Sequence, residues 1–213
     1  RNISVREESG QLLVKKLSGR NVPVVCDPTL LFTGEEWLDI QQEDALEKEP
    51  YILCYFLGKN PIHRDFARKL KQETDCKIIA LPHLDEYVLA DEKYADEKRY
   101  DIDPSDFLNL VRNADYVCTD SFHCTVFSIL YRRNFFVFHR YPQKTRHSTN
   151  SRIDSLFHVL GISDCLLSGD EAVSDCLHLS IDYKEVDKKI DALRKKSLEY
   201  LLTSLRDEKV TDL

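Results

Sequence analysis

The chain has 213 residues, of which 42% are hydrophobic and 31% are charged, and this balance excludes a disordered protein. The formal net charge of -7 argues against a dedicated nucleic-acid binder, because such proteins carry a basic surface. The apolar runs are short, and none approaches the roughly 20 residues of a membrane span, so we expect no transmembrane segment.

Short apolar runs alternate with longer amphipathic segments along the first part of the chain. These patterns predict, in order, a strand at 3–6, a helix at 7–17, a strand at 22–26, a short helix at 34–40, a strand at 51–56, a helix at 61–73 and a strand at 77–81. Residues 82–103 are polar and irregular, and we expect them to form a long loop at one edge of the sheet.

The alternation then resumes. It predicts a helix at 104–113, a strand at 115–119, a helix at 121–131, a strand at 135–138, a basic structureless segment at 139–150, a helix at 151–160 and a long charged helix at 183–205. Apolar strands that alternate with helices indicate a parallel sheet covered on both faces, so the predicted fold class is α/β, a doubly wound Rossmann-like sheet. We find no clear boundary and treat residues 1–213 as a single domain. Ligands of such sheets bind beyond the carboxyl ends of the strands.

Cysteine usage indicates a reducing environment. The chain has seven cysteines, an odd number, and no Cys-x-x-Cys pair. We therefore expect buried, reduced thiols in a cytoplasmic protein and no zinc site.

The segment 115–123 places an apolar strand directly before a polar turn and a helix. The first N–H groups of such a helix, together with its dipole, favour an anion, and the hydroxyls of Thr119 and Ser121 add donors. His123 lies in the first turn, where it can face a ligand. The alternative is that Asp120 or Ser121 only caps the helix and that His123 is an ordinary surface histidine.

At this segment the sequence resembles the polysaccharide pyruvyltransferase family. Residues 119–131 read T-D-S-F-H-C-T-V-F-S-I-L-Y, close to the family's T-D-S-F-H-G-T-V-F-S-I-L-F. Three further matches follow the family order, with S-V-R-E at 4–7, D-P-T-L-L at 27–31 and N-S-R-I at 150–153. Each piece is modest alone, but four in the right order are specific.

The resemblance implies a fold of two Rossmann-like domains that face each other across a cleft, the GT-B type. The chain is similar to the C-terminal, donor-binding half of that pair, and it opens without Met. We therefore expect a fragment whose N-terminal, acceptor-side domain is absent, and we expect this fragment alone to be inactive. The helix at 183–205 would pack toward the missing domain, or would simply be an amphipathic closing helix.

The resemblance also implies a reaction, the transfer of pyruvate from phosphoenolpyruvate to a pair of sugar hydroxyls in bacterial capsule or exopolysaccharide synthesis. His123 matches the family histidine proposed as the general acid, and imidazole suits proton transfer near neutral pH. Arg6 ends the first strand and would hold a carboxylate or phosphate, unless it only pairs with Glu7 or Glu8. No cofactor or metal is expected beyond the donor substrate.

Further residues are candidates for substrate contacts. Thr119, Ser121 and Phe122 would line the donor site, and Asn150 and Arg152 would contact an anion or simply begin a helix. The basic residues Arg140, Lys144 and Arg146 would form a mobile cationic lid or a solvated charge run. Asp27 and Asp120, at carboxyl ends of strands, are candidates for the base that activates a sugar hydroxyl, although capping is the commoner role of Asp there.

The match to the family has two departures. Ser121 stands where some members carry an arginine, and Cys124 replaces the usual glycine, which adds bulk next to the ligand; we expect its thiol to be inert. Two other functions stay open, namely a GT-B glycosyltransferase that uses a nucleotide sugar and a non-catalytic sugar- or anion-binding module. Fold alone does not separate the enzymes.

Overall fold

The computed structural model describes residues 2–41, 47, 49–82, 84–142 and 148–208. The chain divides into two compact units. Unit 1 comprises Arg1–Phe32, Ser151–Gly161 and Ile181–Leu213, and unit 2 comprises Thr33–Asn150 and Ile162–Ser180.

Unit 2 contains a six-stranded sheet. Its strands are β1 (Tyr51–Tyr55), β2 (Lys77–Ala80), β3 (Glu97–Lys98), β4 (Tyr116–Thr119), β5 (Asn134–Phe138) and β6 (Leu166–Leu167). The order across the sheet is β3-β2-β1-β4-β5-β6, and every neighbouring pair is parallel. This is the order of a Rossmann sheet, with its switch point between β1 and β4. The prediction of an α/β, doubly wound parallel sheet is confirmed.

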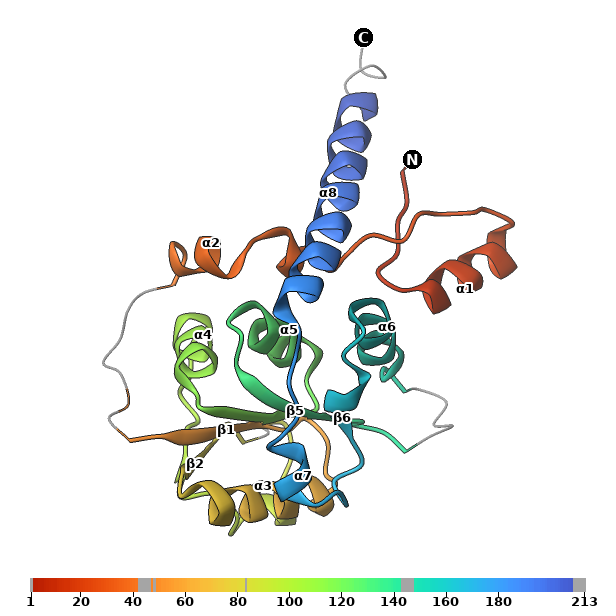
Figure 1. The fold of residues 1–213 in the computed structure, drawn as a ribbon. Helices are drawn as coiled ribbons and strands as arrows, with labels where there is room; N and C mark the ends of the chain where they lie inside the picture. Colours follow the sequence, from red (N-terminus) through yellow and green to blue (C-terminus); the bar gives the residue numbers. More distant parts are fainter. Residues whose placement is uncertain (1, 42–46, 48, 83, 143–147, 209–213) are drawn as a thin grey trace. The chain divides into compact units, whose positions relative to one another are not determined.

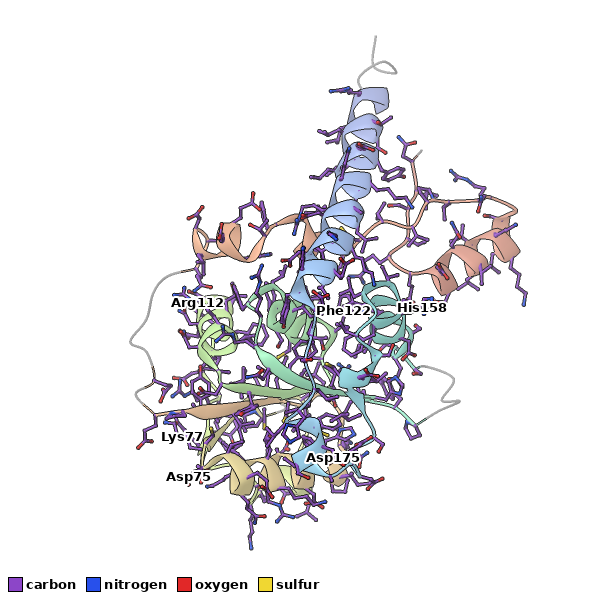
Figure 2. All side chains as sticks on the ribbon, viewed as in Figure 1. Asp75, Lys77, Arg112, Phe122, His158 and Asp175 are labelled. Atoms are coloured by element: carbon purple, nitrogen blue, oxygen red, sulfur yellow. The ribbon has the colours of Figure 1, made fainter. Side chains whose placement is uncertain are left out.

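Helices cover both faces of this sheet (Figure 1). One face carries α4 (Pro104–Asn113) and α5 (Phe122–Leu130), and the other carries α3 (Pro61–Thr74) and α7 (Val173–Cys176). The remaining helices of unit 2 are the short α2 (Gly34–Leu38) and the 3-10 turns η2 (Leu89–Asp91) and η3 (Ser163–Cys165). Figure 2 labels Phe122 on the α5 side of the sheet and Asp175 of α7 on the opposite side.

The core of unit 2 follows from the register of the strands. Leu53 of β1 stands beside Ile79 of β2 and Val117 of β4, and Val117 stands beside Phe135 of β5. All four are buried and, because side chains alternate along a strand, they share one face. On the other face, a cluster that includes Ile52, Cys54, Phe66, Phe136 and Phe138 fills the space between the sheet and α3. An apolar row on each face explains why both sides need helices.

Unit 1 contains α1 (Glu8–Ser18), η1 (Pro28–Leu31), α6 (Ser151–Leu160) and α8 (Tyr183–Glu208). The helix α8 contacts α6 and η1. Lys189 donates to the carbonyl of Leu160 at 2.8 Å, and Arg194 donates to the carbonyl of Leu30 at 2.9 Å. The predicted long C-terminal helix is therefore present, and its base is fixed by side chains that satisfy carbonyls at the ends of its neighbours.

The structure differs from the predicted elements in two places. The segments 3–6 and 22–26, expected to be strands, meet only in one parallel bridge between Val5 and Val24. Pro23 has no N–H to donate, so the ladder cannot extend there. The expected loop at 82–103 contains η2 and the edge strand β3, whose residues Glu97 and Lys98 give no apolar signal.

Candidate functional site

The junction between β4 and α5 lies at the carboxyl edge of the sheet and begins as the sequence predicts. Ser121 has extended backbone angles and caps α5, and its hydroxyl accepts the Cys124 N–H at 3.5 Å. Its carbonyl accepts both the N–H and the hydroxyl of Thr125, at 3.0 and 2.8 Å. The start of α5 is therefore fixed from inside the fold, and the positive end of its dipole lies beyond the strand.

His123 lies in the first turn of α5, and its side chain is exposed, whereas the residues of α5 that follow it are buried up to Ile129. Its ring stands edge-on to that of Phe122, with the centroids 5.5 Å apart. Phe122 is half-buried and is labelled at the start of α5 in Figure 2. The imidazole is thus at the surface rather than in the core, a position in which it can reach a ligand.

Thr119 serves the fold and has no exposed surface. Its hydroxyl donates to the Tyr55 carbonyl at 2.6 Å and accepts the Ser121 N–H at 3.0 Å. These two bonds tie the end of β4 to the end of β1 and set the direction of the turn. Because its single proton is committed to Tyr55, the Thr119 hydroxyl has none to offer a ligand in this arrangement.

Asp120 joins two loops. Its Oδ1 accepts the Leu57 N–H at 2.7 Å and its Oδ2 accepts the Gly58 N–H at 2.8 Å, so it holds the loop after β1 against the turn after β4. The Nε of Arg140 stands 3.8 Å from Oδ1. Burial raises the pKa of Asp120, although the two N–H donors and Arg140 act in the opposite direction. Both oxygens are occupied and shielded, which favours the turn-forming role over that of a base.

Asn150 closes a loop through its side-chain amide. The amide nitrogen donates to the Tyr141 carbonyl at 2.8 Å, and the amide oxygen accepts the Tyr141 N–H at 3.3 Å. The side chain is buried and imitates a strand partner for Tyr141. It positions the segment that follows β5, and this contact uses both ends of the amide.

Arg6 and Asp27, both in unit 1, form an ion pair. The bridge between Val5 and Val24 brings their segments together, so two motifs far apart in the sequence meet. Burial by itself would raise the pKa of Asp27, but the N–H and hydroxyl of Thr29 and the guanidinium of Arg6 outweigh it and hold that pKa below its ordinary value. Asp27 is therefore a stable carboxylate and a weak base, while the side chain of Arg6 stays partly exposed.

Arg152 lies in the first turn of α6, in unit 1, and is half-buried. Of the expected cationic lid, Arg140 is described, whereas Lys144 and Arg146 lie outside the described residues. Thr119, Asp120, Ser121, Phe122 and His123 are thus gathered at one junction of unit 2.

The cysteines lie in the interior of the fold. All seven cysteines are free and buried, and burial raises the pKa of Cys124 to about 12. The prediction of an inert thiol at this position is consistent with that environment. Within the described residues, three or more His, Cys, Asp or Glu side chains nowhere gather as metal ligands would. None of the helices in this described part of the chain has both the length and the hydrophobicity of a membrane span.

Two residues near the carboxyl edge of the sheet were not recognised from the sequence as parts of a site. Gly58 follows β1 where a Cβ atom would stand 2.8 Å from Oδ2 of Asp120 and 3.2 Å from the Arg140 carbonyl. His63 lies in α3 and is buried. A glycine shortly after an apolar strand is the signal that could have marked Gly58. Nothing in the spacing of the histidines marks His63.

Comparison with known proteins gives one family. A family model described as polysaccharide pyruvyl transferase matches residues 1–140. No curated protein matches the chain. One similar solved structure is titled "Crystal Structure Analysis of the Glycotransferase of kitacinnamycin"; it is 12% identical, with a TM-score of 0.39 over 75% of this chain and 42% of that one. The chain therefore spans less than half the length of that structure.

Proposed function

The chain belongs to the polysaccharide pyruvyl transferase family, and from this membership we propose that the protein transfers pyruvate from phosphoenolpyruvate to two hydroxyls of a saccharide, forming a cyclic ketal. The observation that carries the proposal is the family match over residues 1–140, which includes the junction with the exposed His123. We further propose that the reaction serves bacterial surface or exopolysaccharide synthesis in the cytoplasm, where the free thiols would stay reduced.

The chemistry requires one proton donor and a site for a small anion. The methylene carbon of the donor takes a proton and becomes a methyl group, and a sugar oxygen bonds to the neighbouring carbon. The second sugar oxygen then displaces phosphate, so that one hydroxyl proton replaces the proton that the acid supplied and the other leaves with phosphate. His123 is our candidate for the acid, because its imidazole is exposed at a helix N-terminus, where an anionic donor is favoured.

The other candidate residues differ in whether their polar atoms already bind other groups of the protein. Arg6 is the candidate for a donor carboxylate or phosphate, because its guanidinium keeps exposed surface while Asp27 anchors it. Arg152 is a second cationic candidate. Thr119, Asp120 and Ser121 act by positioning the turn before His123, since their polar atoms bind the protein itself.

Donor binding tests the proposal against a glycosyltransferase. Calorimetry on the complete gene product should show binding of phosphoenolpyruvate and weaker or no binding of nucleoside diphosphate sugars. Pyruvate, which lacks the phosphate, is the matched control and should bind much more weakly. A clear preference for a nucleotide sugar would replace pyruvyl transfer by glycosyl transfer.

A further inference from the structure

A cavity of about 570 Å³ lies within unit 2, beyond the carboxyl ends of β1, β5 and β6. Its polar lining comes from the loop after β1, the first turn of α3 and the segments after β5 and β6, namely Lys59, Asn60, His63, His139, Arg140 and Ser168. Tyr141, Pro142 and Leu167 add apolar surface. Among the described residues that line the cavity there is no Asp or Glu. The lining thus combines cations and neutral donors with an apolar wall.

The tautomer of His63 follows from its neighbour. Asn60 caps α3 through its amide oxygen, which accepts the Ile62 N–H at 3.1 Å, so its amide nitrogen is the atom that faces Nε2 of His63 at 3.1 Å. Nε2 must therefore accept, and the ring proton lies on Nδ1. Burial, followed by the charges of Arg64 and His139, lowers the pKa of His63 to about 4, so the ring stays neutral near pH 7.

This leaves a buried N–H without an acceptor. His63 is only 2% exposed, and its Nδ1 has no hydrogen-bond partner within the described part of the chain. A buried donor left unpaired costs about 1–3 kcal/mol, and His63 is one of the residues that line the cavity. The ring is held in place by stacking on Phe138, with centroids 4.6 Å apart. A ligand that brings an acceptor oxygen would satisfy it.

Arg140 supplies the second unsatisfied group. Its Nε is buried and makes no hydrogen bond in the described residues, since the 3.8 Å to Asp120 Oδ1 is too long for one. Lys59 pairs with Glu86, but both side chains are about half exposed, and such a pair contributes little and exchanges easily. Lys59 can therefore turn to a ligand without breaking a strong contact, and Arg140 has an Nε–H that no group of the described protein uses.

We propose that this cavity binds the phosphate group of a phosphorylated small molecule, with Lys59, Arg140 and the Nδ1–H of His63 as its donors. Two cations match the charge of a phosphate dianion, and the N-terminus of α3 adds its dipole. The cavity is much larger than a phosphate, so the apolar wall of Tyr141, Pro142 and Leu167 would receive the rest of the molecule. Phosphate binding in this cavity does not depend on whether His123 is the acid of the proposed reaction.

Calorimetry on the full chain tests this site with inorganic phosphate, phosphoenolpyruvate and UDP as probes, and with pyruvate as the control that lacks phosphate. The variants K59Q, R140Q and H63F each remove one donor, and H63F keeps a ring to stack on Phe138. K69Q is the matched control, because Lys69 is exposed on the same helix α3 and lies outside the cavity lining. Amide shifts of Lys59 and Ser168 in NMR spectra locate the binding.

We expect K59Q and R140Q to lower the affinity for the phosphate-bearing probes roughly tenfold or more, and H63F to lower it about fivefold. K69Q should change this affinity less than twofold. Whichever of phosphoenolpyruvate or UDP competes with inorganic phosphate identifies the source of the group. Unchanged affinity in both K59Q and R140Q overturns the proposal, as does an equal loss in K69Q or equal binding of pyruvate. The exposed position of Lys59 keeps the test valid if R140Q or H63F fails to fold.

The two proposals fail separately. H123A should leave the affinity of inorganic phosphate for the cavity within twofold, because His123 is outside its lining, while it lowers turnover about 10²–10⁴-fold. Loss of turnover with intact phosphate binding supports both proposals. Loss of phosphate binding in H123A, with amide shifts confined to Phe122 and His123, assigns the anion to the α5 junction and overturns the cavity site.

Discussion

At the scale of single residues, Gly58 is the tightest point of the candidate site. An added Cβ would stand 2.8 Å from Oδ2 of Asp120 and 3.2 Å from the Arg140 carbonyl. We predict that Gly58→Ala destabilises the protein by about 1–3 kcal/mol, because the loop and the turn must move apart. Urea unfolding measures the change.

The matched control is Gly10→Ala, in the helix α1, where the new Cβ would make only an ordinary 3.4 Å contact with Val5. This substitution should stabilise the protein by about 0.5–1 kcal/mol through helix propensity. A shift of the urea midpoint in the same direction for both variants would contradict the steric crowding that we infer at Gly58.

Asp27 gives a prediction about acid stability. Its pKa is lower in the folded protein than its ordinary value of 3.8, so the unfolded chain binds more protons in the window between the two values. The stability from the Arg6 and Thr29 contacts is fully present above pH 3.8 and is lost as the pH falls through the folded pKa. The difference in the free energy of unfolding between wild type and Asp27→Asn, measured with urea, should therefore be largest at neutral pH and should decrease at acid pH. A difference that does not decrease would contradict the pairing.

Residue positions were predictable where local patterns fix them. The strand-turn-helix pattern placed His123 in the first turn, as the structure does, and left Asp120 and Ser121 as alternative caps, of which the structure has Ser121. The partner of Arg6 was not predictable in the same way, since Glu7 and Glu8 are nearer in sequence than Asp27. The choice depends on the parallel bridge between Val5 and Val24, a contact between distant segments that no local pattern encodes.

At the scale of elements, Arg64 links α3 to η2. Its Nε donates to Asp91 at 2.8 Å and its Nη1 to the Asn60 carbonyl at 3.2 Å, and the guanidinium lies 4.8 Å from the Phe56 ring centroid. The side chain is 2% exposed, so Arg64→Met leaves Asp91 without its charge partner. We predict a loss of about 3 kcal/mol in the free energy of unfolding.

Arg68→Met is the control on the same helix. Arg68 pairs with Asp65, but both side chains are about half exposed, and the change should stay within about 0.5 kcal/mol. Comparable losses in the two variants, measured by urea unfolding, would show that burial of the Arg64 pair does not matter.

The elements that sequence could not predict are the two edges of the sheet. β3 is two charged residues long and β6 is two leucines long, and neither is long enough to show alternation. A short edge strand is also one of the devices that prevent a sheet from pairing with other chains, and in β3 charged side chains add to this effect, so the missing signal has a physical cause. The four inner strands were predicted because they are apolar on both faces, as a covered parallel sheet requires.

At the scale of the whole molecule, the seven cysteines report on global opening. All are buried, and burial raises the pKa of Cys165 to about 11 and that of Cys124 to about 12. We predict that a thiol reagent at neutral pH labels the native protein very slowly and labels all seven cysteines once denaturant unfolds it. Fast labelling of any cysteine in the native protein would mean that its part of the fold opens locally.

The order of the sheet explains why both candidate sites lie at the same edge. Strands β1 and β4 are neighbours in the sheet and are followed by helices on opposite faces, so their loops separate at the switch point. Asp120 holds these loops together, with the start of α5 on one side and Arg140 on the other. The alternation of elements predicted this edge as the place of ligands, whereas the cavity depends on side chains that only the folded chain brings together.

The role of His123 is tested most directly by measuring pyruvate transfer from labelled phosphoenolpyruvate to a panel of oligosaccharides, together with phosphate release, by the complete gene product. We predict that His123→Ala lowers turnover about 10²–10⁴-fold with an unchanged fold, while His178→Ala, which removes another exposed histidine of unit 2, leaves it at the wild-type rate. Turnover of His123→Ala within a few-fold of wild type would contradict the account.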